Sequence, residues 1–418
     1  MPDGRPMVKV SRQRSAELRI ELLDGAAAEL RRVGFDAMAL TAIATRCGMA
    51  TSAIYNRFPT KAALVAALIA ERIEPCLGNQ VDRAASDFWS GTSDPSPIDL
   101  DQLGVIAELL LAARHDATIR EPVHGFIRRH CEIALDARAQ GESRGLVRSG
   151  QDPRVQVLFR AARWIGNYVC GLASAPPERG SMAIDELMRR TLLDLPTDTP
   201  LPIEEPSSRR VAPPMPTRDD HTHDAICAAL VDAAADVFAD KGYEAATVSD
   251  IARRAGLTTG AIYNRFDGKA DLMTEVIINE IGPNAQHRGF DLIGTLAASS
   301  QLSNAALDVI LEHFDDDTNV RDRGLRLASR DAARREPQVA AVIGPIQDNV
   351  MVSMADFVRT AQGEGLIRHD VDPEAVVWWV VANPLGISLL RGVFPELRID
   401  DWAPTYATAL EILRTPPR

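Results

Sequence analysis

A short segment that occurs twice constrains this chain more than any other feature. The chain carries AIYNRF at residues 53–58 and again, unaltered, at 261–266, which is close to half of its 418 residues further on. At the same offset of 208, about half of the residues between Gly34 and Leu64 are identical, without a gap. Self-similarity at a fixed spacing indicates one structural unit made twice. The fold must therefore accommodate two copies of that unit.

The duplication extends beyond this segment. The motif GLVR at 145–148 returns as GLIR at 365–368, now at an offset of 220, and an Asp-Pro pair follows each motif at the same distance. Insertions in loops explain the drift in the offset. We therefore expect a tandem of two complete units, with domain boundaries at 1–73, 74–195, 196–222, 223–282 and 283–418.

The composition predicts a soluble, all-α protein. Apolar residues make up 46% and charged residues 25%, as in soluble globular proteins, while aromatic residues are sparse at 5%. The first 20 residues are polar and basic, unlike a signal peptide. The most apolar run, 376–390, contains Asn383 and Pro384 and is too short to span a bilayer. The five cysteines show no CxxC spacing, which favours reduced thiols and a cytoplasmic location without a membrane partner.

The repeated segment lies in a helix-turn-helix pattern. A short helix is expected at 40–46, a tight turn at 47–49 around a glycine, and a second helix at about 50–58. Ile54 and Phe58 are four residues apart and must face the core, so Ser52, Tyr55 and Asn56 project from the opposite side. Such a small, polar face fits a DNA major groove about 12 Å wide. Lys61, at the start of the next helix, is expected to hold a phosphate.

These residues resemble the DNA-binding domain of the TetR family of bacterial regulators. The family pattern is a helix ending in Gly, then Thr-x-x-Asp/Glu-Ile-Ala-x-x-Ala-Gly-Val, then a recognition helix carrying Leu-Tyr-x-x-Phe, then Lys. The second copy matches it closely from Gly242 to Lys269, and the first copy matches it less fully from Gly34 to Lys61. The resemblance implies a double-stranded DNA operator, an unknown small-molecule effector and dimeric assembly.

The resemblance also implies roles for particular side chains. It places six residues at base edges, namely Thr41, Thr51, Ser52, Ser249, Thr259 and Gly260. It places four at phosphates, namely Tyr55, Lys61, Tyr263 and Lys269. Asn56 and Asn264 are expected to face the groove, where Asn pairs with adenine. For Arg57 and Arg265 a surface ion pair and a phosphate contact both remain open.

The two copies differ in capping and charge. Thr247 and Asp250 form a capping box, but their equivalents are Ala39 and Ala42, and losing such a cap costs about 1 kcal/mol. Residues 1–70 hold ten Lys and Arg against six Asp and Glu, whereas residues 222–275 hold five against nine. Because phosphate neutralisation dominates DNA affinity, the first copy is predicted to bind DNA more tightly. Residues 1–19 are either a frayed terminus or a basic arm that follows phosphates.

Two apolar helices are expected to pair the halves. Each Asp-Pro pair begins a helix, and 155–172 and 375–390 correspond to the dimer-interface helices of TetR-type proteins. An internal pseudo-dimer is predicted, with a homodimer of chains as the alternative. Four aromatic residues are either core or effector contacts, namely Trp164, Tyr168, Trp378 and Trp379.

The Pro-rich stretch 196–222 is expected to be a semi-extended linker with a reach of up to roughly 80 Å. His221 and His223 within it, flanked by aspartates, either bind a metal or lie in solvent, and solvent is the preferred interpretation. No Walker loop, dinucleotide fingerprint, GxSxG, HExxH or zinc spacing is present, so we expect no catalysis, no cofactor and no metal. The predicted function is a ligand-responsive, DNA-binding transcriptional repressor. The alternative is a helical small-molecule sensor or interaction protein with weakened DNA binding.

Overall fold

The computed structural model describes residues 6–92, 98–177, 180–196, 199–202, 209–216, 225–284 and 317–414. Over these residues the chain is helical, apart from turns, extended segments and two isolated β-bridges, which confirms the predicted all-α class. In the first half the helices are α1 (Pro6–Ala37), α2 (Leu40–Arg46), α3 (Thr51–Tyr55), α4 (Lys61–Leu68), η1 (Ile69–Gly78), α5 (Asn79–Trp89), α6 (Leu100–Ala113), α7 (Ala117–Ser143), α8 (Pro153–Gly171) and α9 (Ser181–Leu192). In the second half they are α10 (Ala225–Ala245), α11 (Val248–Arg254), α12 (Thr259–Tyr263), α13 (Lys269–Val276), η3 (Ile277–Ile281), α16 (Asp317–Ala333), α17 (Pro337–Gly363), α18 (Pro373–Val393) and α19 (Ile399–Leu413).

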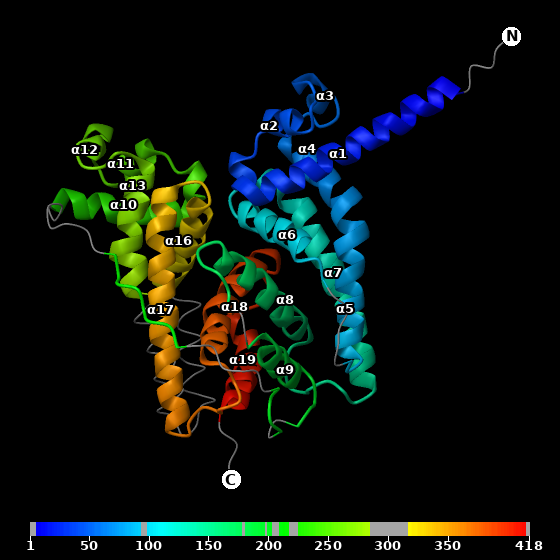
Figure 1. Ribbon diagram of the computed structural model, residues 1–418, viewed down its shortest axis with the longest axis vertical. Helices are drawn as coiled ribbons and strands as arrows, with labels where there is room; N and C mark the ends of the chain where they lie inside the picture. The colour runs from blue at the N-terminus through cyan, green and yellow to red at the C-terminus, as the bar shows by residue number, and fades with distance from the viewer. Residues whose placement is uncertain are drawn as a thin grey trace. The chain divides into compact units, whose positions relative to one another are not determined.

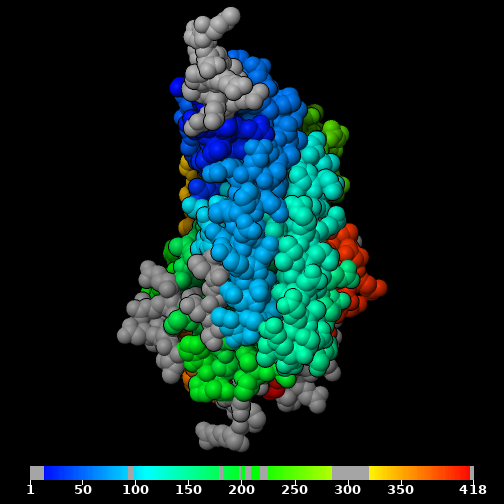
Figure 2. Space-filling view, turned by 90° about the vertical axis from the view of Figure 1, so that its right-hand side faces the viewer, coloured from blue at the N-terminus to red at the C-terminus, as the bar shows by residue number. Residues whose placement is uncertain are grey.

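The chain forms two compact units, residues 1–85 with 94–133, and residues 86–93 with 134–418. The first unit holds α1 to α4, α6 and most of α5 and α7. Its α7 is joined to α5 by a hydrogen bond between His130 Nδ1 and Asp82 Oδ1 at 2.7 Å, and Figure 2 shows the two helices side by side. The domain boundaries expected from the sequence stay a prediction.

The four-residue spacing of Leu18, Leu22, Ala26 and Leu30 predicts a first helix from about residue 16 to 33, ended by Gly34. The helix in the structure is longer. It begins at Pro6 rather than near residue 16, because proline suits the first helical position and the polar residues after it carry no apolar stripe to reveal a helix. At the predicted end, Gly34 leaves the helical region with φ 76° and ψ 169°, and this kink is followed by a short further helical segment up to Ala37. Gly242 does the same in the second copy, with φ 75° and ψ 168°. The side chains of the basic residues Lys9 and Arg12, and Arg5 as a whole, lie outside the described part.

The second unit is built around α8 and α18. These two helices pack against each other, and α9 and α19 pack alongside them (Figure 1). The helices predicted at 155–172 and 375–390 are thus confirmed as helices that meet. The run 376–390 is by itself too short to span a bilayer, but the helix that contains it, α18, has 21 residues. Among the described residues α18 is the one helix long and apolar enough to cross a membrane, and 67% of its apolar window is buried inside the protein. The helix continues through Pro384 without a break.

Two glycines allow α8 and α18 to approach closely. A Cβ added at Gly166 would lie 2.0 Å from the Ala382 carbonyl oxygen, and one added at Gly386 would lie 1.9 Å from the Ala162 carbonyl oxygen. At the offset of 220, Gly166 corresponds to Gly386 and Ala162 to Ala382. The two glycines thus correspond to each other, and so do the two alanines that they face, which is the reciprocal pattern of an interface with twofold symmetry.

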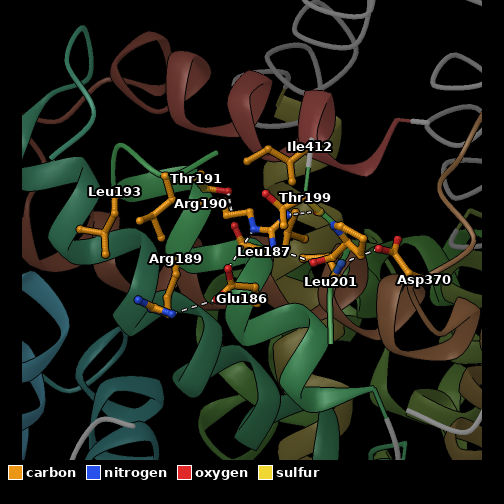
Figure 3. A network of polar contacts seen from close by, with 12 residues as sticks. Glu186, Leu187, Arg189, Arg190, Thr191, Leu193, Thr199, Leu201, Asp370 and Ile412 are labelled. Atoms are coloured by element: carbon orange, nitrogen blue, oxygen red, sulfur yellow. Dashed lines mark hydrogen bonds and ion pairs between the residues drawn. The ribbon is translucent and has the colours of Figure 1, made fainter. Parts of the chain in front are cut away.

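The Pro-rich stretch lies on the second unit. Its described parts form no helix, and several of them are bonded to the rest of this unit. The linker boundaries of 196–222 stay a prediction. The Thr199 carbonyl accepts a hydrogen bond from Arg190, near the end of α9 (Figure 3). It accepts another from Arg368, which follows α17. Leu201 is 2% exposed, and its N–H donates to Asp370 Oδ2 at 2.5 Å. His221 and His223 lie outside the described residues.

Candidate nucleic-acid interface

Two helix-turn-helix units stand out in the structure. We call α1 to α4 the first reader and α10 to α13 the second reader. In both, a glycine with positive φ makes the turn between the two short helices, with φ 65° at Gly48 and 68° at Gly256. A Cβ would meet nothing within 4 Å at either position, so it is the left-handed backbone, not space, that favours glycine there.

The recognition helices α3 and α12 each bury one side and expose the other. Ile54 and Phe58 are at most 1% exposed, and Ile262 and Phe266 at most 2%, so the predicted core face is confirmed in both readers. In the first reader Phe58 also lies under the Arg19 guanidinium, 4.7 Å from the ring centroid. These contacts fix the rotation of each helix and therefore decide which residues face outward.

The residues predicted to contact bases all face outward. Thr41, Thr51, Ser52 and Asn56 are exposed in the first reader, as are Ser249, Thr259, Gly260 and Asn264 in the second. Tyr55 is 46% exposed and Tyr263 62% exposed. None of these side chains forms a hydrogen bond to another described residue, so their donors and acceptors remain available to a ligand. Their contacts with DNA stay a prediction.

The two predicted phosphate-binding lysines already have partners. Lys61 Nζ donates to the carbonyl oxygens of Phe35 at 3.3 Å and Asp36 at 2.8 Å, which follow the kink at Gly34 in α1. Lys269 Nζ makes the equivalent bond to the Glu244 carbonyl at 3.2 Å, and burial lowers its pKa. Lys61 thus joins α4 to α1, and Lys269 joins α13 to α10, a role that the sequence alone did not reveal. A phosphate contact from the remaining N–H groups stays a prediction.

Arg57 and Arg265 also repeat each other's geometry. Arg57 Nη1 donates to the Ala53 carbonyl at 3.1 Å, and Arg265 Nη1 donates to the Ala261 carbonyl at 3.4 Å. Each guanidinium therefore bonds to its own recognition helix, four residues back. These bonds do not decide between a surface ion pair and a phosphate contact for the two arginines.

The readers differ in the caps of their short helices. Thr247 and Asp250 form the predicted capping box on α11, whereas Ala39 gives α2 no side-chain cap. The recognition helix follows the same rule, since Thr258 Oγ1 accepts from the Ala261 N–H at 3.3 Å and Ala50 has no equivalent. The Thr258 cap was missed, although Thr directly before a helix is a known start signal. The second reader is therefore the better capped at α11 and α12. At the next helix the order is reversed, because Thr60 Oγ1 accepts from the Ala63 N–H on α4 and Gly268 gives α13 no side-chain cap.

Charge separates the readers further. Asp250 accepts hydrogen bonds from Lys241 and Thr247, which hold the pKa of its carboxyl well below the usual range, and it also pairs with Arg253. Arg254 pairs with Asp236. In the first reader, Arg14 is exposed and pairs with no other described residue. The capping carboxylate of the second reader thus pairs with Lys241 and Arg253, whose counterparts in the first reader are Val33 and Thr45.

The four aromatic residues proposed for an effector lie on α8 and α18. Trp378 donates from Nε1 to Asn167 Oδ1 at 3.0 Å, across the contact between these helices. Trp379 is 2% exposed and packs near the rings of Phe159 and Tyr406. Trp164 lies under the Arg160 guanidinium, 4.6 Å from its centroid, and Tyr168 is half-buried. This placement favours core packing for Trp378 and Trp379, and an effector contact stays a prediction.

The paired short helices, the glycine turn and the polar outer face define a helix-turn-helix protein with two DNA-reading units. Comparison with known proteins agrees with this class. The model of the tetR family of bacterial regulatory proteins matches residues 22–68 and 230–276, one segment in each reader. The chain belongs to the TetR family and carries the matched domain twice.

Individual relatives match over parts of the chain. The transcriptional activator FasR of Mycolicibacterium smegmatis is 31% identical over 140 residues, which cover 34% of this chain and 61% of FasR. The transcriptional repressor KstR2 of Rhodococcus jostii is 37% identical over 87 residues, 20% of this chain and 38% of KstR2. The crystal structure of the TetR-family regulator PfmR from Thermus thermophilus is 21% identical and covers 45% of this chain and 96% of its own, with a TM-score of 0.32. The chain thus spans less than two thirds of FasR and KstR2.

Proposed function

We propose that the chain is a sequence-specific, DNA-binding transcriptional regulator that acts in the cytoplasm as a ligand-responsive repressor. The observation that carries this proposal is the matched pair of outward faces on α3 and α12. Each presents Thr, Tyr and Asn at equivalent positions, exposed and without partners among the described residues. Such a face supplies the donors and acceptors that read base edges in a major groove.

We further propose that the two halves form one internal pseudo-dimer on a pseudo-palindromic operator. Helix-turn-helix dimers place two recognition helices in successive major grooves, about 34 Å apart. The reciprocal approach of Gly166 to Ala382 and of Gly386 to Ala162 supports pairing of the halves within the chain. Salt bridges and hydrogen bonds add to it, since Arg154 pairs with Glu396 at 3.1 Å and Gln151 donates to Thr408 Oγ1 at 2.9 Å.

The proposed half-sites are unequal. The first reader has a net charge of +4 over residues 1–70, while the second has −4 over 222–275. Ion pairs occupy arginines in both readers, such as Arg46 with Glu29 and Arg254 with Asp236, so the difference lies in the net charge. Since phosphate contacts dominate DNA affinity, the first reader contributes more of the binding free energy. The Ser52 and Gly260 pair is one of few differences between the outward faces, so flanking charge sets most of the asymmetry.

The names of three relatives bear on the effector and on the direction of regulation. FasR is named an activator and KstR2 a repressor, and another relative, from Bacillus subtilis, is named a fatty acid metabolism regulator protein. We propose repression relieved by a small organic effector that binds the helical regulatory part of either half. A ligand shifts the population of DNA-binding states only if its affinity for those states differs.

A binding assay with DNA flanking the protein's own gene tests the proposal, combined with light scattering of the complex. We expect one 418-residue chain per operator and a loss of affinity of about 1 to 3 kcal/mol for Asn56→Ala or Asn264→Ala, largest at one half-site each. The two variants serve as matched controls for each other. Binding of DNA only by two or more chains would exclude the pseudo-dimer, and absence of specific binding would favour the sensor or interaction protein.

A further inference from the structure

The Pro-rich linker continues along the second half after its first contact. Arg209 pairs with Asp356 at 3.1 Å, and Arg210 with Glu374 at 2.9 Å. Asn349, on α17, donates from Nδ2 to the Pro213 carbonyl at 2.6 Å. Met215 then packs against the hydrophobic core of the second half. The described linker residues therefore lie on the second half both at 199–201 and at 209–216.

The surface under residues 199–201 is not shared by the two halves. In the first half, Arg148 donates to carbonyl oxygens at and after the end of α9, including those of Arg190 and Leu193. Its counterpart Arg368 likewise donates to the Ile412 carbonyl on α19, but it also holds the Thr199 carbonyl at 2.9 Å. The arginine of the second half thus binds the linker in addition to the last helix of its own half.

Asp370 also binds the linker. Asp370 accepts from the Leu201 N–H and from Arg368 Nε, both at 2.5 Å. The equivalent position in the first half is Gly150, which has no side chain to offer. The bonds from Arg368 and from the Leu201 N–H hold the pKa of Asp370 below its usual range despite burial. The linker-binding group is therefore a departure from the duplicated pattern, on the half that follows the linker.

The start of the linker is held from the other half. Arg190, near the end of α9, donates to the carbonyl oxygens of Thr199 and Pro200 and also pairs with Glu186 (Figure 3). The Thr199 carbonyl thus lies between an arginine of the first half and an arginine of the second. The nine residues from 217 to 225, where α10 begins, span at most about 30 Å.

These observations limit which halves can pair. A linker bound at 209–216 is committed to the second half that follows it, because little chain remains before α10. The same linker is fixed to the preceding first half by Arg190. For a first half to pair with the second half of another chain, the linker would have to leave one of these two sites.

We propose that the surface formed by Arg368, Asp370, Asn349 and Glu374 is a docking site for the chain's own linker, and that its occupation selects pairing of the two halves within one chain over exchange between chains. This inference rests on the internal pseudo-dimer of the proposed function. Intramolecular pairing already benefits from a high effective concentration. The docked linker adds a structural preference, because an exchanged pair loses these contacts.

The test refolds a mixture of two differently tagged full-length chains from urea and measures how much of each tag is captured with the other. The wild type is expected to refold without mixing. Leu201→Ala is expected to raise the mixed fraction roughly tenfold or more, since truncation of a buried leucine ordinarily costs more than one factor of ten in an equilibrium. Val211→Ala is the matched control, because Val211 lies in the same linker but is 92% exposed.

A second variant approaches the site from the other side. Asp370→Gly introduces the residue found at the equivalent position of the first half and is expected to mix as Leu201→Ala does, with circular dichroism confirming that each variant is folded. Equal mixing of Leu201→Ala and Val211→Ala would overturn the docking inference while leaving the pseudo-dimer intact. Free mixing of the wild type would instead contradict the pseudo-dimer itself.

Discussion

The close approach of α8 and α18 makes a sharp prediction about two glycines in one helix. Gly386 has no room for a Cβ, which would lie 1.9 Å from the Ala162 carbonyl oxygen and 2.7 Å from its carbonyl carbon. Gly392, six residues further along α18, is exposed, and a Cβ there meets nothing within 4 Å. The same substitution to alanine therefore tests packing at one position and helix propensity at the other.

The expected effects have opposite signs. Alanine at Gly386 forces the two backbones apart, and overpacking of this kind costs about 1 to 3 kcal/mol, of which the helix propensity of alanine recovers up to about 1 kcal/mol. Alanine at Gly392 gains that propensity with no opposing cost. Gly166→Ala is expected to match Gly386→Ala, because its Cβ would lie 2.0 Å from the Ala382 carbonyl oxygen.

Urea unfolding followed by circular dichroism measures the difference. We expect the midpoint to fall for Gly386→Ala and Gly166→Ala and to hold or rise for Gly392→Ala. Parallel denaturant slopes would show that stability, and not the extent of unfolding, has changed. A midpoint for Gly386→Ala equal to that of Gly392→Ala would refute the close packing of the two helices.

Three further predictions concern the readers. Thr247→Ala should cost about 1 kcal/mol and speed amide hydrogen exchange in α11, whereas Ala39→Thr combined with Ala42→Asp should slow exchange in α2; equal exchange in α2 and α11 of the wild type would contradict this. The hydrogen bond from Lys241 is the largest cause of the lowered pKa of Asp250. The stabilisation by this carboxylate is therefore present above about pH 4 and is lost as pH falls through the folded-state pKa. The difference in urea midpoint between the wild type and Asp250→Asn should accordingly shrink in acid. Deletion of residues 1–15 should reduce the salt dependence of DNA binding, and Lys61→Ala should weaken binding more than Lys269→Ala; a harmless deletion with equal losses would show that charge does not set the asymmetry.

The parts of the fold that sequence predicted well are local. The helix at 40–46, the glycine turn at 48 and the buried pair Ile54 and Phe58 follow from spacing and from the backbone preferences of a few neighbouring residues. The capping box at Thr247 is local in the same sense. Each of these features depends on residues within about one turn of helix of each other, which is the range over which sequence patterns carry information.

The features that sequence missed depend on backbone acceptors far along the chain. Lys61 binds carbonyls 25 and 26 residues away, and Arg368 binds the Thr199 carbonyl across 169 residues. Every residue has a carbonyl, so the identity of the acceptor residue gives no signal. Asp370 did carry one, because the duplicated motif has Gly150 in its place. A charged residue that replaces glycine in one copy of a repeat indicates a contact that only that copy makes.

A tandem chain can hold such differences where a homodimer cannot. In a symmetric dimer, any substitution appears on both sides of the interface, so a carboxylate that binds a linker or caps one reader would be present twice. Here Asp370 and Asp250 correspond to Gly150 and Ala42 in the other copy. The packing positions have been kept instead, with glycine at both 166 and 386 and alanine at both 162 and 382. The duplicated chain thus keeps the glycine and alanine pairs that let α8 and α18 approach closely. It differs at the carboxylates that bind the linker or cap α11, and a homodimer could not confine such a difference to one side.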